Sequence, residues 1–171
     1  DTGGDKSIAF SPDGQTLATI GWRDLSVHLW NVASGTPLLT FSPEATVYER
    51  TGFSPEGRIL FALAYRDVRL WDAGTGQLLY SLEHADWVDG IAFHPSGNVI
   101  AVDSRDSFVR LWDVSTGQLL QTLDGPTSEV SGIAFSSDGR FLAAGDRAGT
   151  VTLWMAGETP VGSASAPRPC R

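Results

Sequence analysis

Four short segments of the chain end in tryptophan and recur at almost constant spacing. They are Val27-His28-Leu29-Trp30, Val68-Arg69-Leu70-Trp71, Val109-Arg110-Leu111-Trp112 and Val151-Thr152-Leu153-Trp154. Their tryptophans lie 41, 41 and 42 residues apart, and Phe10, Phe53, Phe93 and Phe135 recur with spacings of 43, 40 and 42. Two independent landmarks with one period indicate a tandem array of about four units, which limits the fold to the repeat architectures.

Each unit has the pattern of short β-strands joined by turns. A Ser-Pro-Asp-Gly sequence, as at residues 11–14, suits a type I turn and is followed by a short apolar run such as Thr16–Ile20. The strand that ends in tryptophan comes next, then a polar turn such as Ser115–Gly117 and a strand such as Leu119–Leu123. Because no segment keeps a 3.6-residue apolar period, we expect an all-β chain without helices.

A four-stranded unit of this length that ends in Trp-Asp is typical of a propeller blade. Leu70-Trp71-Asp72, Leu111-Trp112-Asp113, Leu29-Trp30-Asn31 and Glu83-His84 carry the pattern, and by them the chain resembles the WD40-repeat family in its bacterial form. The resemblance implies an all-β β-propeller built of about four four-stranded WD40-type blades. We place the repeats in residues 1–157, with units at about 1–42, 43–83, 84–124 and 125–157, and a flexible tail at 158–171.

Four blades are few for a family whose rings resemble the larger propellers. Three arrangements therefore stay open. We expect first that the chain is part of a larger seven- or eight-bladed ring whose remaining blades belong to a longer chain. The second option is a homodimer, in which each chain gives half of an eight-bladed ring, and the third is closure of four blades alone. The last unit lacks a clear fourth strand, and an unpaired sheet edge favours association.

WD40 relatives often link a His, a Ser or Thr, an Asp and the Trp of one blade by hydrogen bonds. Only the third unit keeps most of this set, as His84, Asp106 and Trp112, to which the resemblance gives a structural role along with Trp30, Trp71 and Trp154. At the Ser position, counted four residues before the turn Asp, stand Ile20, Leu63, Val102 and Ala144. We therefore expect the blades to cohere mainly by apolar packing, at about 1.5–3 kcal/mol per buried side chain.

Every unit carries an arginine in the turn between its second and third strands. These are Arg23, Arg66, Arg105 and Arg147, and Trp22 and Tyr65 precede two of them. Trp87 lies in the loop that enters the third unit, where the other units have Gly4, Val47 and Glu129. The resemblance places these turns and loops on the propeller face that relatives use to hold peptides. Arg, Trp and Tyr are enriched in binding hot spots. The alternative is that each Arg forms an ion pair within its own blade.

Composition excludes several other functions. The net charge of −8 argues against a nucleic-acid partner, and no apolar run is long enough for a membrane helix. The single cysteine, Cys170, excludes an intramolecular disulfide and a thiolate zinc site. We find no catalytic motif, and His84 with Asp86 and Asp89 is only a weak candidate for a cation site. We expect no enzyme activity, no cofactor, no metal and a cytoplasmic location.

The sequence therefore predicts a non-enzymatic interaction scaffold or sensor module that presents a propeller face to a protein or peptide partner, with an acidic partner as one option. In bacterial relatives such propellers are often attached to signalling domains, and this association rests on the resemblance alone. Two alternatives stay open. One is a small-ligand-binding or enzymatic propeller with a pocket in its central channel. The other is a truncated or engineered propeller fragment without activity of its own.

Overall fold

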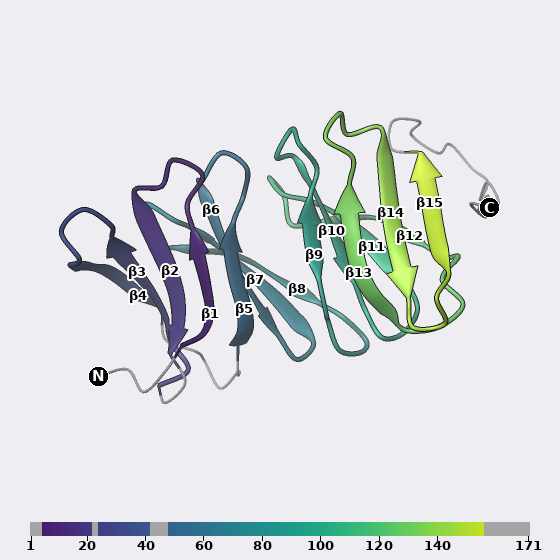
Figure 1. The fold of residues 1–171 in the computed structure, drawn as a ribbon, viewed down its shortest axis with the longest axis horizontal. Coiled ribbons are helices and arrows are strands. Elements are labelled where there is room, and N and C mark those ends of the chain that lie inside the picture. The colour runs from purple at the N-terminus through teal and green to yellow at the C-terminus, as the bar shows by residue number, and fades with distance from the viewer. Residues whose placement is uncertain (1–4, 22–23, 42–47, 156–171) are drawn as a thin grey trace. The chain divides into compact units, whose positions relative to one another are not determined.

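The computed structural model describes residues 5–21, 24–41 and 48–155, and these residues form strands and turns without a helix. The chain divides into two units, Asp1–His84 and Ala85–Arg171. The first unit contains two four-stranded antiparallel sheets (Figure 1). Sheet 1 consists of β1 (Asp5–Phe10), β2 (Thr16–Gly21), β3 (Val27–Asn31) and β4 (Pro37–Phe41). Sheet 2 consists of β5 (Tyr48–Phe53), β6 (Ile59–Ala64), β7 (Asp67–Asp72) and β8 (Leu78–Glu83).

The second unit repeats the arrangement. Sheet 3 consists of β9 (Ile91–Phe93), β10 (Val99–Asp103), β11 (Val109–Asp113) and β12 (Leu119–Leu123). Sheet 4 consists, within the described residues, of β13 (Val130–Phe135), β14 (Phe141–Asp146) and β15 (Val151–Met155). The expected tail at 158–171 lies outside the described part of the chain. No described segment is a helix that could cross a membrane.

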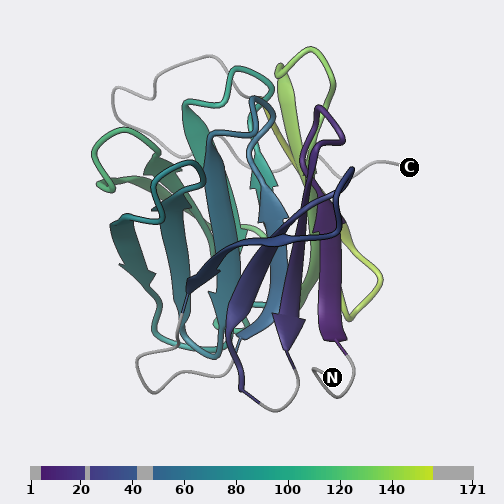
Figure 2. The ribbon, with the colours of Figure 1, turned by 90° about the vertical axis from the view of Figure 1, so that its left-hand side faces the viewer.

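In every sheet the strands pair in chain order, so that each neighbour in sequence is also the neighbour in space (Figure 2). The third strand of each sheet carries the repeated tryptophan, and the second strand pairs with it in antiparallel register, as in Leu17 opposite Trp30 and Ile100 opposite Trp112. This arrangement of consecutive antiparallel strands confirms the all-β, blade-type fold that the repeat predicts.

In sheets 1 to 3 the turn after the tryptophan strand shows why the residue after Trp is polar. The Oδ1 atom of Asp113 accepts hydrogen bonds from the backbone N–H and hydroxyl groups of Ser115 and Thr116, at 2.6 to 3.0 Å. Gly117 follows with φ +67°, a left-handed conformation that would be strained for a residue with a side chain. Asp72 and Asn31 fold the same turn in sheets 2 and 1. The turn is thus closed by its own residues.

Sheets 1 and 2 pack face to face through β1, β2 and β5. Sheet 1 contributes the aliphatic residues Ala18, Ile20, Val27 and Leu29 and the aromatic Phe41 to the core between them. Sheet 2 contributes Leu60, Ala62, Ala64, Tyr48 and Trp71, and the Trp71 ring lies 5.4 Å from Phe41 and 5.7 Å from Tyr48 between ring centroids. Apolar packing therefore joins these blades.

Sheets 3 and 4 pack in the same way through β9, β10 and β13. Ala101, Val109 and Leu123 of sheet 3 meet Val130, Leu142 and Ala144 of sheet 4. One polar contact accompanies this core, because His94 Nε2 lies 3.2 Å from the carbonyl oxygen of Gly139. His94 occupies the turn position held by Ser11, Ser54 and Ser136 in the other sheets, and its imidazole reaches the neighbouring sheet where a serine side chain bonds within its own turn.

Candidate interaction site

The turns that carry the arginines join the second and third strands of a sheet. They lie at the same end of the sheet as the loop that leads into its first strand. In sheet 3 the N–H of Arg105 donates to the carbonyl oxygen of Trp87 at 2.9 Å, and in sheet 4 the N–H of Arg147 donates to Glu129 at the same distance. These bonds fix each arginine turn against the loop before the first strand of its own sheet. In the other unit, the N–H of His84 donates to the carbonyl oxygen of Arg66 at 2.9 Å.

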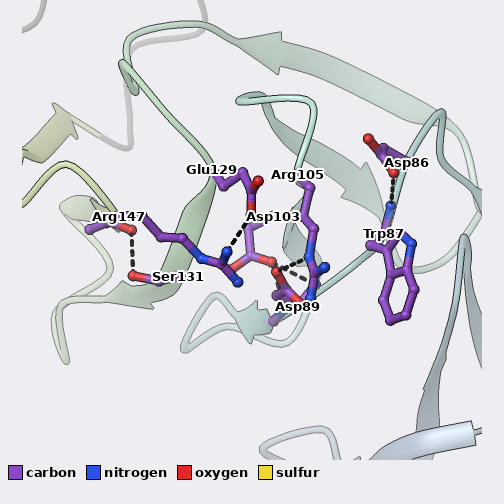
Figure 3. A network of polar contacts seen from close by, with 10 residues as sticks. Asp86, Trp87, Asp89, Asp103, Arg105, Glu129, Ser131 and Arg147 are labelled. Atoms are coloured by element: carbon purple, nitrogen blue, oxygen red, sulfur yellow. Dashed lines mark hydrogen bonds and ion pairs between the residues drawn. The ribbon is translucent and has the colours of Figure 1, made fainter.

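In sheet 3 the Arg105 side chain is held from two sides (Figure 3). Its Nε and Nη2 atoms donate to the two carboxylate oxygens of Asp89 at 2.8 and 3.0 Å. Its guanidinium carbon lies 4.5 Å from the centroid of the Trp87 ring, within the range of a cation–π interaction. The bonds to Asp89 raise the pKa of Arg105 above its ordinary value. The result is a half-buried platform of one indole, one guanidinium and one carboxylate.

The backbone of Asp89 is itself held in place by a buried carboxylate. Asp103, at the end of β10, accepts hydrogen bonds through Oδ1 from the backbone N–H groups of Asp89, at 3.1 Å, and Gly90. The Cβ atom of any larger residue at position 90 would collide with the Asp103 carboxylate, which explains the glycine there. The loop before β9 is therefore held to the second strand, and with it the platform.

The equivalent arginine of sheet 4 has a carboxylate where sheet 3 has the indole. Arg147 Nη1 lies 2.9 Å from Glu129 Oε2 (Figure 3), and the Arg147 side chain is largely exposed to solvent whereas Glu129 is half-buried. Glu129 occupies the repeat position of Trp87. The sheet 3 and sheet 4 sites thus differ in one decisive respect, because only the former offers an aromatic surface.

Arg66, in the first unit, is exposed and lies 5.3 Å from the centroid of the exposed Tyr65 ring. Among the described residues no ion pair includes Arg66. Trp22 and Arg23, the other predicted binding residues, lie outside the described part of the chain. The structure thus brings together Trp87 with Arg105 and Tyr65 with Arg66, each pair within one unit.

The turn aspartates pair with another set of basic side chains. In the first three sheets the turn Asp contacts the basic residue two positions before the tryptophan: Asp24 with His28 at 2.9 Å, Asp67 with Arg69 at 3.0 Å and Asp106 with Arg110 at 2.6 Å. Sheet 4 has Ala148 and Thr152 at the two positions, so both partners are replaced together. Arg105 and Arg147 each form an ion pair within their own blade, as the alternative expects, but their partners are Asp89 and Glu129 and not the residue beside them in the turn.

Burial works against ionisation of Asp106, but the hydrogen bonds from Arg110 and the N–H of Phe108 outweigh it and lower the pKa of Asp106 below its ordinary value.

His84, at the family's His position, is buried, and its Nδ1 lies 2.9 Å from the carbonyl oxygen of Leu82. In sheet 4 the indole N–H of Trp154 donates to the carbonyl oxygen of Asp124 at 3.2 Å. These contacts are structural in kind, since they join neighbouring parts of the fold.

The link between the second strand and the tryptophan occurs in sheet 1, where the Trp30 N–H donates to Thr19 Oγ1 at 3.1 Å. The expected position, Ile20, was wrong by one residue, and so was Leu63, since Ala62 lies opposite Arg69 as Thr19 lies opposite His28. The reason is where the Asp stands in the turn: the turn position follows the paired residue of the second strand by five residues in sheets 1 and 2 and by four residues in sheets 3 and 4.

In the weak candidate cation site formed by His84, Asp86 and Asp89, the two carboxylates already form other contacts. Asp89 is paired with Arg105, and Asp86 Oδ1 accepts the backbone N–H of Trp87 at 2.8 Å. Within the described ranges no group of three or more His, Cys, Asp or Glu residues could hold a metal ion.

Sequence reasoning named Asp89 and Glu129 but did not identify them as the partners of the two arginines. The available signals were weak: Asp89 lies two residues after Trp87, and Glu129 shares the repeat position of Trp87.

Comparison with known proteins agrees with the fold. The family model described as WD domain, G-beta repeat matches residues 6–31, 76–113 and 117–155, more than half of the chain. The chain is 32% identical over 130 residues to telomerase protein component 1 of Rattus norvegicus, an alignment that covers 74% of this chain and 5% of the relative.

Two further relatives cover larger shares of their own lengths. The Lissencephaly-1 homolog of Caenorhabditis briggsae is 32% identical over 100 residues, 56% of this chain and 25% of the relative. Target of rapamycin complex subunit wat1 of Schizosaccharomyces pombe is 28% identical over 106 residues, 60% of this chain and 34% of the relative. The chain thus spans a minor part of each of these relatives. On its repeats, its blade-type sheets and the extent of the family match, the chain belongs to the WD40 repeat family.

Proposed function

We propose that the chain is a non-enzymatic interaction module that binds a protein or peptide partner at the Trp87–Arg105–Asp89 platform of sheet 3. The observation that carries the proposal is the stacking of the Arg105 guanidinium at 4.5 Å from the Trp87 ring while Asp89 holds it by two hydrogen bonds. Trp and Arg are the residue types that most often contribute the largest share of binding energy at interfaces.

The platform is arranged before a partner arrives. Bonds from the backbone of Asp89 and Gly90 to Asp103, and from Arg105 to Trp87, fix the two loops that carry it. A side chain that is already held in one rotamer loses less conformational entropy on binding than a mobile one. Relatives named as a component or a complex subunit support a role in assemblies.

The charge pairing of the platform bears on the type of partner. Because Asp89 and Glu129 already neutralise Arg105 and Arg147, an acidic partner would have to displace a carboxylate of the chain itself at these positions. We therefore propose a partner that presents an apolar or aromatic side chain to Trp87, with hydrogen bonds at the rim.

Peptides selected from a random phage-displayed library against the immobilised chain provide the test. We expect the selected peptides to lose about tenfold or more in affinity for Trp87→Ala, as is usual for a hot-spot residue. Thr116→Ala, in the turn at the other end of the sheet 3 strands, is the matched control and should bind as the unmodified chain does. Equal affinity for Trp87→Ala and the unmodified chain would reject the site.

A further inference from the structure

A second exposed aromatic residue lies on the turn that carries Arg105. Phe108 directly precedes β11, and it is 39% exposed. Its carbonyl oxygen accepts the N–H of Ser104 at 3.2 Å, and the N–H of Ser107 donates to the carbonyl oxygen of Ser104 at 3.1 Å. These two bonds close the turn around Arg105. Because the N–H of Arg105 also donates to the carbonyl oxygen of Trp87, Phe108 and the Trp87 platform lie at the same end of sheet 3.

The contacts of Phe108 repeat the arrangement of the platform. The guanidinium carbon of Arg110 lies 5.8 Å from the centroid of the Phe108 ring, as that of Arg105 lies 4.5 Å from the Trp87 ring. Arg110 donates two hydrogen bonds to Asp106, as Arg105 does to its own carboxylate in the platform. An acidic partner group would have to displace one of these carboxylates, and a basic group would meet a paired arginine. Both rings therefore favour uncharged, apolar side chains.

Sheet 4 shows that the turn does not require an aromatic residue. Thr150 stands there at the position of Phe108, and Gly149 at that of Ser107. The same two backbone bonds close the turn, from the N–H of Asp146 to Thr150 at 2.9 Å and from the N–H of Gly149 to Asp146 at 3.0 Å. Ser107 and Gly149 are both left-handed, with φ of +67° and +82°. Since the turn forms equally with threonine, the exposed ring of Phe108 has no role in closing it.

We propose that the partner of the Trp87 platform is an extended peptide segment with two apolar side chains, one packed on Trp87 and the other on Phe108. This inference rests on the proposed function and specifies the partner of that same site. The backbone bond from Arg105 and the short turn limit the distance between the Cα atoms of Trp87 and Phe108 to at most about 18 Å. An extended segment covers this distance in about five residues, so the two apolar residues lie within about five positions of each other.

The phage-selected peptides test the proposal when their affinities are measured by isothermal titration calorimetry. Phe108→Thr copies Thr150 of sheet 4 and should lower the affinity about fivefold or more, as truncation of a hot-spot residue does. Leu120→Thr removes an apolar side chain that is 54% exposed on β12, and this matched control should leave the affinity unchanged. If Phe108→Thr lowers the melting temperature, Phe108→Ser, which copies Ser26 of sheet 1, replaces it.

Alanine substitutions in the peptide identify the two contacts. One apolar peptide residue should matter in the unmodified chain and much less in Phe108→Thr, and a second should show the same dependence on Trp87→Ala. Peptides that lose affinity for Trp87→Ala but not for Phe108→Thr would overturn this inference and leave the platform intact. Loss for Phe108→Thr alone would also overturn it, because the partner would then not contact Trp87. Unchanged affinity for both variants, or a selection without any binding peptide, would reject the platform as well.

Discussion

Arg110 and Asp106 are joined by two hydrogen bonds, Nη2 to Oδ2 at 2.6 Å and Nη1 to Oδ1 at 3.2 Å, across the turn that leads into β11. Both side chains are largely shielded from solvent. The corresponding positions in sheet 4, Ala148 and Thr152, carry neither charge. The pair therefore acts as a unit that the fold tolerates either complete or absent.

A double-mutant cycle at this pair should show the coupling. We expect Asp106→Ala to destabilise sheet 3 most, because it leaves the Arg110 charge half-buried without its main partner. The double variant Asp106→Ala with Arg110→Thr, which copies sheet 4, should cost less than the sum of the single variants by about 1 kcal/mol. Urea unfolding gives the three free energies, and strict additivity would show that the two residues do not stabilise each other.

The contact between His94 and Gly139 makes one of two equivalent glycines sensitive to substitution. Gly14 and Gly139 occupy the same turn position with φ of +69° and +72°, so alanine strains the backbone of either by about 1 kcal/mol. A Cβ at Gly14 meets nothing within 4 Å, whereas one at Gly139 collides with the His94 imidazole. Gly139→Ala should therefore lower the melting temperature more than Gly14→Ala.

The same pair offers a rescue experiment. His94→Ser restores the serine found at this turn position in the other sheets and removes the colliding ring. In the His94→Ser background the two Gly→Ala changes should have similar effects on the melting temperature. If Gly139→Ala remains more harmful there, the imidazole is not the cause.

Acid should weaken the turns that follow the tryptophan strands. Hydrogen bonds from Ser115 and Thr116 lower the pKa of Asp113, and those from Thr75 and Gly74 lower the pKa of Asp72, below the ordinary value of 3.8. A carboxylate with a depressed folded-state pKa stabilises the protein fully above its unfolded pKa. This contribution is lost as the pH falls below 3.8 through the folded-state value.

Asp113→Asn tests this dependence, because Asn31 forms the same turn in sheet 1 with an amide oxygen. The variant should unfold at a urea concentration close to that of the unmodified chain at pH 7 and lose less stability between pH 5 and pH 3. Glu56→Gln, at an exposed turn residue of sheet 2, is the control. An unchanged acid response in Asp113→Asn would show that the turn carboxylate does not contribute.

The fold was predictable because the landmarks of the repeat are themselves strand residues. The positions of Val109, Leu111 and Trp112 lie in the third strand of every repeat. The Gly and Pro turns between strands leave little freedom in how the strands are joined. The residue that accepts the Trp30 indole N–H was harder to predict. The turn Asp follows this position by five residues in sheet 1 and by four in sheet 3, so one fixed count selects Ile20 in place of Thr19.

The candidate site was predictable in its residue types but not in its pairing. Trp87 and Arg105 were both recognisable, yet their contact depends on the path of the loop before β9, which hydrogen bonds to Asp103 determine. Asp89 lies 16 residues before Arg105 in sequence, and only the backbone geometry brings the two side chains together. Loop side chains lack a period, so the sequence pattern does not specify their partners.

The turn closed by Asp113, Ser115 and Thr116 has a consequence for how such a chain changes over evolutionary time. Because Asp72 and Asp113 begin turns of the same pattern, a recombination event that joins one to the other deletes or adds 41 residues and leaves every turn with its full set of bonds. The number of blades can then vary between descendants by crossovers in the gene, without the invention of a new turn.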